Sequence, residues 1–194
     1  RKEELLCRVG YQKIHLMPDY MVRLDKGCEI DLGGIAKGFL SQKMIELFRE
    51  KNVTAAVISL GGNIQTYGQK PGKKDFSIGI TDPFLKENTI GTILVKEKAV
   101  VTSGAYQRYF EQDGKVYHHI MDTRTGAPAE SGLASVTVIA DDGAYADAMA
   151  TALYVMGEKR AKEYQKSHPD IDIVLINTSG EIWASSGVVS DDLV

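Results

Sequence analysis

The sequence predicts an α+β fold in which two similar halves, each a βαβ-type unit with antiparallel strands, pack around one core. One observation is a pattern that occurs twice: strand, acid, glycine, helix, strand, glycine turn, strand. A second is the series of short strand-like runs separated by Gly, Pro, Asn and Asp, which is typical of antiparallel strands. The third is the length, because 194 residues suit a single core. We therefore expect residues 1–194 to form a single globular domain.

Composition and charge exclude several classes of protein. With 43% hydrophobic and 25% charged residues, the chain is neither disordered nor a disulfide-dense scaffold. The net charge is −3 and the basic residues are scattered, so no continuous surface for nucleic acid is expected. Cys7 and Cys28 lack metal-ligand spacing, and we expect both thiols to be buried.

The first half begins with two expected strands, residues 8–17 and 20–31, joined at Pro18-Asp19. A helix is expected over residues 37–50, because its apolar residues recur with helical spacing. The residues of its expected core face are Leu40, Met44, Leu47 and Phe48.

Strand-like runs follow this helix. The expected strands lie at residues 55–60, 64–67, 75–80, 90–95 and 98–102. Their short length and turn-forming separators predict an antiparallel meander. A polar, glycine-containing passage over residues 102–133 then leads to the second half.

The second half repeats the pattern of the first. A strand over residues 134–140 leads into an apolar helix at about 144–156, and a charged helix then extends to about residue 167. Strands are expected again at residues 171–176 and 181–184, joined by a Ser-Gly turn. This similarity is one of pattern more than of residue identity.

Residues 31–38 (D-L-G-G-I-A-K-G) organise the first half as a candidate anion site. Gly33 and Gly34 allow a tight turn and close approach of the backbone to a ligand, and the free N–H groups of the following helix favour phosphate. Lys37 adds a mobile positive charge. The spacing is neither a dinucleotide fingerprint nor a Walker A loop, so a simple strand-to-helix turn with a solvated lysine remains an alternative.

The apolar helix of the second half contains an acid. Asp147 and Thr151 lie four residues apart and so share one face, roughly 5–6 Å from each other. A buried carboxylate needs a partner, and hard oxygen ligands of this kind suit Mg²⁺ or Ca²⁺. Hydrogen bonds to nearby backbone are the alternative for both side chains. The expected core face of this helix comprises Tyr145, Met149, Leu153 and Met156.

A second group of polar residues spans positions 101–126. His118 and His119 are adjacent, so on a strand their side chains point to opposite faces and only one can enter a shared site. His119 is a candidate general base, or else an edge-strand histidine bonded to backbone. Arg124 is more typical of a solvated arginine than of a phosphate clamp. Neither a nucleophile elbow nor a glycosidase-like carboxylate pair is present in the sequence.

Taken together, these segments resemble one known family. The segments are D-L-G-G-I-A-K-G (31–38), S-L-G-G-N-I (59–64), V-T-S-G-A-Y-Q-R-Y-F (101–110), H-H-I-M-D-T-R-T-G-A-P (118–128) and A-D-A-M-A-T-A-L (146–153). In order and spacing they are similar to the ApbE family, the FAD:protein FMN transferases. The resemblance extends over almost the whole chain and implies the ApbE-like fold, which agrees with the two similar halves.

The resemblance implies a Mg²⁺-dependent reaction. FAD, the substrate, would be split at its pyrophosphate; FMN would be attached through a phosphoester to a threonine or serine of a target flavoprotein, and AMP would leave. Hydrolysis of FAD to FMN and AMP, or non-catalytic FAD binding, are the alternatives. The chain would lack an N-terminal portion of the family's full length, and family analogy implies a lipoprotein at the extracytoplasmic face of a bacterial membrane. The oligomeric state stays open.

The resemblance also assigns roles to individual residues. The implied metal ligands are Asp147, Thr151 and the backbone carbonyl of Ala36. The implied contacts to FAD are Gly33, Gly34 and Lys37 at the phosphates, and Ser103, Gly104 and Tyr106 in the flavin-site segment. His119 is the implied base for the acceptor hydroxyl. Many relatives carry Asp at Gln42, Asp or Ser at Ala105 and Pro at Thr123; the first two departures bear on contacts to FAD or the acceptor.

Overall fold

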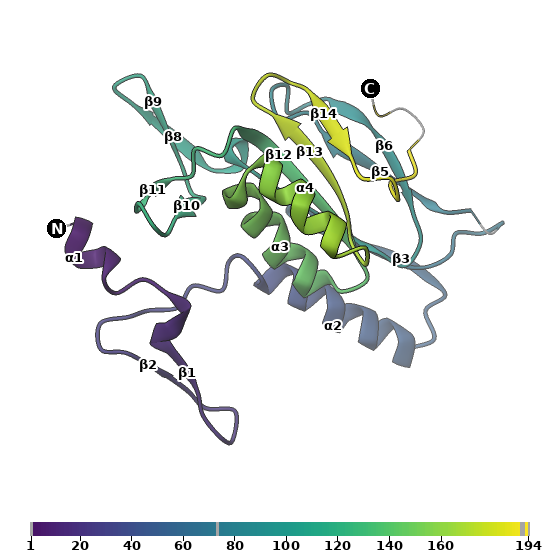
Figure 1. The fold of residues 1–194 in the computed structure, drawn as a ribbon. Coiled ribbons are helices and arrows are strands. Elements are labelled where there is room, and N and C mark those ends of the chain that lie inside the picture. Colours follow the sequence, from purple (N-terminus) through teal and green to yellow (C-terminus); the bar gives the residue numbers. More distant parts are fainter. Residues whose placement is uncertain (1, 73, 191–192, 194) are drawn as a thin grey trace.

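A six-stranded antiparallel sheet forms the centre of the molecule (Figure 1). The computed structural model describes residues 2–72, 74–190 and 193. The strands, in their order across the sheet, are β14 (Ile182–Ala184), β13 (Asp172–Asn177), β12 (Leu133–Ala140), β7 (Ala99–Gly104), β4 (Asn63–Gly68) and β3 (Ala55–Leu60). Every neighbouring pair is antiparallel. This arrangement confirms the predicted α+β class with antiparallel strands.

Two apolar layers cover the sheet. The helices α2 (Ala36–Glu50), α3 (Gly143–Met156) and α4 (Glu158–Ser167) lie on one side, as Figure 1 shows. Val136 and Val138 point from β12 into the core cluster of α3 and α4, whereas Ile139 belongs to a second cluster with the hairpin of β5 (Phe76–Thr81) and β6 (Thr89–Val95). This alternation is the period of two that a strand imposes on its side chains. The centre of the sheet, at β12, is therefore buried on both faces.

The predicted meander is wrong in its pairing. β4 pairs with β7 and not with β5, because β5 and β6 form a separate hairpin outside the central sheet. The polar passage before β12 also contains structure of its own. Its elements are η2 (Ala105–Gln107), β8 (Tyr109–Gln112), β9 (Lys115–His118), β10 (Met121–Asp122) and β11 (Ala127–Pro128).

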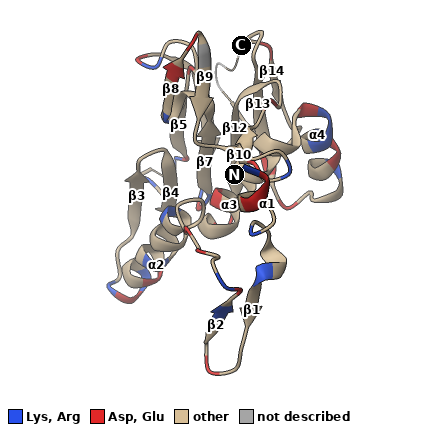
Figure 2. Ribbon diagram, turned by 90° about the vertical axis from the view of Figure 1, so that its left-hand side faces the viewer, with Lys and Arg blue, Asp and Glu red and all other residues tan. Residues whose placement is uncertain are grey.

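The two long strands expected before the first helix are short. After α1 (Lys2–Leu6) and η1 (Tyr11–Lys13), the chain forms only β1 (Ile14–Leu16) and β2 (Val22–Leu24). These two strands pair with each other and project away from the central sheet (Figures 1 and 2). β2 ends where Cys28 N–H donates to the Asp25 carbonyl across a turn containing Gly27, whose φ is +80°. The first half therefore lacks the sheet strand that precedes the helix in the second half.

The predicted core face of the first helix is wrong for Leu40 and Leu47, whereas Met44 and Phe48 are partly buried. In α2 the buried residues are Gly38, Ser41 and Ile45, whereas Leu40 and Leu47 are about half exposed (51% and 48%). α2 packs against α3 at a contact between backbones, which only small residues permit. A Cβ atom on Gly38 would lie 2.0 Å from the carbonyl oxygen of Gly143.

α3 is buried on most sides, and of its four expected core residues Leu153 is fully buried, as predicted. The buried residues are Gly143, Ala146, Asp147, Ala150, Leu153 and Tyr154. Tyr145, Met149 and Met156 pack, partly buried, against the same core cluster. The expected burial of the thiols is contradicted, since Cys7 is exposed and Cys28 is half-buried.

The close contact of α2 and α3 predicts a stability effect. We expect Gly38→Ala to lower the free energy of unfolding by about 1–3 kcal/mol, because the added methyl group forces the two helices apart. Gly34→Ala is the matched control, since a Cβ there meets nothing within 4 Å and should change stability by less than about 0.5 kcal/mol. Urea unfolding measures both variants, and equal stabilities would contradict the packing described.

Charged side chains of both signs are interspersed along α2 and α4 (Figure 2). In the part of the chain that the structure describes, no helix is long and apolar enough to cross a membrane.

Candidate active site

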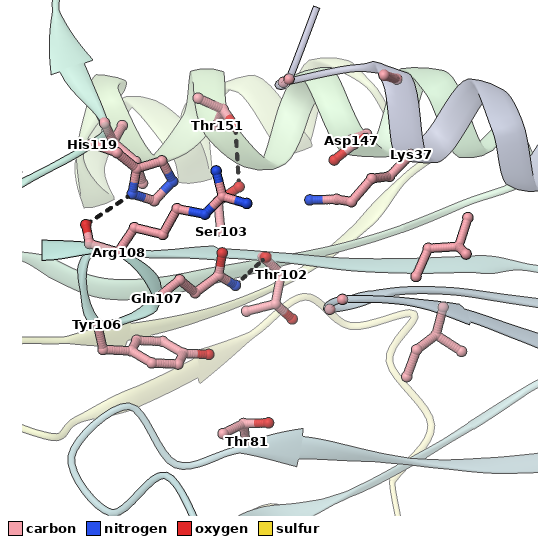
Figure 3. A pocket seen from close by; sticks show the side chains of 18 of the residues that line it. Lys37, Thr81, Thr102, Ser103, Tyr106, Gln107, Arg108, His119, Asp147 and Thr151 are labelled. Atoms are coloured by element: carbon pink, nitrogen blue, oxygen red, sulfur yellow. Dashed lines mark hydrogen bonds between the residues drawn. The ribbon is translucent and has the colours of Figure 1, made fainter.

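A cavity of about 1050 Å³ lies between the N-terminus of α2, the middle of α3, the end of β7 and the β5–β6 hairpin (Figure 3). It brings together nine of the ten positions singled out in the sequence, from segments that are far apart in the chain. Those nine are Gly33, Gly34, Ala36, Lys37, Ser103, Tyr106, His119, Asp147 and Thr151.

Asp147 joins the two halves of the molecule. It is 3% exposed, and its Oδ2 accepts a hydrogen bond of 2.8 Å from the backbone N–H of Gly38, 109 residues earlier in the chain. α2 has no side-chain cap of its own at Ile35, so this N–H is one of the unpaired donors that a helix start exposes. Asp147 therefore caps α2 from another helix, and the positive end of the helix dipole stabilises its charge.

Thr151 lies one turn after Asp147 in the same cavity wall. Its Oγ1 is 3.1 Å from the hydroxyl oxygen of Ser103 on β7. The alternative of hydrogen bonds to backbone is found for Asp147, whose partner is a backbone N–H, but not for Thr151, whose hydroxyl contacts the Ser103 side chain and not its own helix.

The oxygen atoms available here fit a hard cation. Asp147, Thr151 and Ala36 all line the cavity and offer a carboxylate, a hydroxyl and a backbone carbonyl. Among the described residues no three His, Cys, Asp or Glu side chains gather at one point, so the donor set is poor for a transition metal. One carboxylate completed by neutral oxygens and by ligand phosphates is how proteins commonly hold Mg²⁺.

A backbone carbonyl holds one ring nitrogen of His119. The backbone N–H of His119 donates to the carbonyl oxygen of Arg108 (N···O 3.1 Å), and the ring Nδ1 lies 3.2 Å from the same oxygen. A carbonyl only accepts, so Nδ1 carries the proton of the neutral ring and Nε2 keeps its lone pair. His119 is therefore equipped to accept a proton through Nε2.

His118 and His119 point to different places, as their adjacency predicts. His118 lines a second cavity of about 570 Å³ and makes an edge-on contact with Tyr154, with ring centroids 5.8 Å apart. Burial lowers the pKa of His118. Only His119 reaches the larger cavity.

Gly33, Gly34 and Lys37, at the start of α2, line the same cavity. Lys37 extends its ammonium group into the cavity (Figure 3), and no ion pair of this lysine occurs within the described residues. Gly33 N–H donates to the Asp31 carboxylate (2.6 Å). Neither Gly33 nor Gly34 has a positive φ, so their contribution is bare backbone at the cavity rather than an unusual turn conformation.

Gly104 is the predicted binding residue that the structure does not place in the cavity wall. A Cβ there would lie 2.4 Å from the ring of Tyr106 and 3.0 Å from the Ala134 carbonyl oxygen. Its role is to make room for the Tyr106 ring, which lines the cavity and whose pKa is raised by burial.

Comparison with known proteins agrees with this geometry. The model of the ApbE family matches residues 1–175. The chain belongs to the ApbE family. The resemblance noted in the sequence is thereby confirmed.

Individual members of the family are similar over most of the chain. An FAD:protein FMN transferase of Treponema pallidum is 35% identical over 96% of this chain and 56% of its own length. An FAD:protein FMN transferase of Klebsiella pneumoniae is 39% identical over 82% of this chain and 49% of its own length. The ApbE protein of Thermotoga maritima superposes with a TM-score of 0.88 (36% identity, 95% of this chain, 60% of that one). Flavin transferase ApbE of Vibrio cholerae superposes with a TM-score of 0.82 and 27% sequence identity, over 95% of this chain and 60% of that one. The chain spans about half the length of the curated relatives it matches.

Some residues of this ApbE cavity were not expected from the sequence. Lys86 and Arg108 add two cations to its wall, and the Gly61-Gly62 turn between β3 and β4 adds bare backbone. The S-L-G-G-N-I motif gave a signal for the turn. Nothing in the sequence distinguished Arg108 from Arg124, whose guanidinium instead binds Asp122 through two hydrogen bonds of 3.1 and 2.8 Å.

Gln42, one departure from the common ApbE pattern, lies outside the cavity wall. Its Oε1 accepts hydrogen bonds from Gln65 Nε2 (2.7 Å) and from the Gly143 backbone (3.4 Å). The residue therefore joins α2, β4 and α3 behind the site, and the expected effect of this departure on FAD contacts is not supported.

Proposed function

We propose that this chain carries the active site of a Mg²⁺-dependent flavin transferase. It would split FAD, attach FMN through a phosphoester to a threonine or serine of a target flavoprotein, and release AMP. One observation carries the proposal: a single cavity unites a buried carboxylate and a hydroxyl on α3, a cation at the start of α2, and a histidine with a free ring nitrogen. The names of the relatives support the same reaction.

In the proposed reaction, the FMN half of FAD passes to the acceptor hydroxyl. The acceptor Oγ attacks the phosphorus of the FMN half, and its proton passes to Nε2 of His119. The bond between that phosphorus and the bridging oxygen breaks, and AMP leaves with the bridging oxygen. Lys37 attracts the diphosphate, while bare backbone at Gly33 and Gly34 lets it approach.

A cation would complete this charge balance. Asp147, Thr151 and the carbonyl of Ala36 would hold Mg²⁺, or Ca²⁺ in its place. The cation supplies neutralisation of the phosphate charge, which is the main chemical demand of phosphoryl transfer. We further propose, by family analogy, that the protein acts at the extracytoplasmic face of a bacterial membrane.

The test is to incubate the protein with FAD, Mg²⁺ and a flavoprotein domain that has an acceptor threonine, and with the same domain carrying Thr→Val. Chromatography measures AMP, and intact-mass spectrometry measures the acceptor. We expect AMP and an FMN adduct with the threonine domain and no adduct with the valine domain. AMP and FMN without any adduct would indicate an FAD pyrophosphatase; absence of both products would indicate an FAD-binding protein.

A further inference from the structure

Arg108 places a cation in the cavity. It follows η2 directly, lines the cavity, and extends its guanidinium into the space between His119 and Lys37 (Figure 3). Over the described residues, this guanidinium makes no hydrogen bond and no ion pair. The backbone oxygen of the same residue holds His119.

Two other cations of this region, Lys86 and Arg124, already have partners. The ammonium of Lys86 lies over the rings of Tyr106 and Tyr109, 6.0 and 5.0 Å from their centroids. Arg124 is neutralised by Asp122. Arg108 has no such neighbour among the described residues, so its N–H donors are available to an external anion.

The acids of the cavity wall do not supply that anion. Among the described lining residues the acids are Asp31 and Asp147, against the bases Lys37, Lys86 and Arg108. Asp31 is bonded to the Gly33 N–H, and one oxygen of Asp147 is bonded to the Gly38 N–H. The described residues of this wall therefore carry more positive than negative charge, which favours an anionic ligand.

We propose that Arg108 binds the phosphate on the FMN side of the substrate, the phosphate that the acceptor hydroxyl attacks. The inference rests on the proposed function and adds a specific residue to it. Its basis is that one residue carries both groups: the carbonyl fixes Nδ1 of His119, and the guanidinium extends past that ring into the cavity. The base and the attacked phosphate would thus be positioned by the same residue. A planar guanidinium also matches two phosphate oxygens at once.

FMN and riboflavin test this assignment, because they differ only in the phosphate and neither can be cleaved at a diphosphate. Flavin fluorescence measures their Kd for the wild type, Arg108→Gln and Arg108→Lys. We expect Arg108→Gln to weaken FMN binding by about 10- to 100-fold, the range for a charge-assisted hydrogen bond, and to change riboflavin binding less than about twofold. Arg108→Lys should restore part of the FMN affinity. Arg124→Gln is the matched control and should leave both affinities unchanged.

Two results would overturn the assignment: unchanged FMN affinity in Arg108→Gln, or equal losses for FMN and riboflavin. Thermal unfolding of each variant verifies that the fold is retained, as expected for an exposed side chain whose guanidinium makes no hydrogen bond or ion pair to the described residues. The binding experiment contains no acceptor and no turnover. A protein that binds FMN through Arg108 but flavinylates nothing would therefore refute the transferase and keep this assignment.

Discussion

Asp147→Ala is expected to reduce Mg²⁺-dependent AMP release by at least about 10³-fold. The proposed cation loses its only carboxylate ligand, and neutralisation of the phosphate charge amounts to several kcal/mol of the barrier, at 1.36 kcal/mol per factor of ten. The same change leaves the buried N–H of Gly38 without its acceptor, at a cost of about 1–3 kcal/mol of stability.

Asp147→Asn separates these two effects. The asparagine side-chain oxygen can still accept from Gly38, so α2 keeps its cap, whereas the negative charge is lost. We expect both variants to be inactive in the AMP assay but only the alanine variant to unfold at lower urea concentration. Full turnover in either variant would refute the metal assignment.

His119→Ala is expected to slow FMN transfer by about 10²- to 10⁴-fold while FMN binding stays close to that of the wild type. The range is the usual contribution of a general base, because the substitution removes the ring and with it the proton-accepting Nε2. Single-turnover measurements of acceptor mass give the transfer rate, and flavin fluorescence gives the affinity.

His118→Ala is the control for this prediction. Its ring lies in the neighbouring cavity against Tyr154, so the change should cost stability and leave the transfer rate within a few fold. If His119→Ala instead loses flavin affinity in proportion to its rate, His119 is a binding residue and the base lies elsewhere.

Local signals in the sequence predicted the three helices that cover the sheet, although not the short helix α1. The first helix was expected over residues 37–50 and spans Ala36–Glu50, since apolar spacing and the preceding glycines mark its start. The helix α3 follows the N-cap Asp142, whose side chain accepts from Tyr145 N–H, and ends at Gly157 with φ of +80°. These are contacts within one or two turns, which the order of residues determines directly.

Non-local contacts explain what the sequence did not predict. A period of two identifies a strand but not its partner, so the insertion of the β5–β6 hairpin between β4 and β7 was missed. Hydrophobicity favoured Leu40 and Leu47 for the core, whereas the contact between the Gly38 and Gly143 backbones determines which face of α2 is buried. Small residues carry no hydrophobic signal, although they determine how closely two helices approach.

In the candidate site, too, local signals were predictable and non-local contacts were not. Asp147 could be singled out because a carboxylate within an apolar helix is unusual, and its cavity position accords with that reasoning. Arg108 could not, because one arginine in a polar segment resembles another until the fold shows which is paired. Gly104 was predicted to contact FAD, whereas it lies outside the cavity wall and leaves room for the Tyr106 ring.

In the proposed reaction, a threonine hydroxyl attacks the FMN-side phosphorus of FAD within this cavity. The most direct measurement is to run the reaction with FAD, Mg²⁺ and the acceptor domain in water enriched in oxygen-18, and to determine the isotope content of both products. Attack by threonine predicts a flavinylated acceptor and AMP that both lack the heavy isotope, because no water enters either phosphate. Oxygen-18 in FMN would indicate attack by water at the FMN phosphorus, oxygen-18 in AMP would indicate attack at the other phosphorus, and either result would contradict the claim.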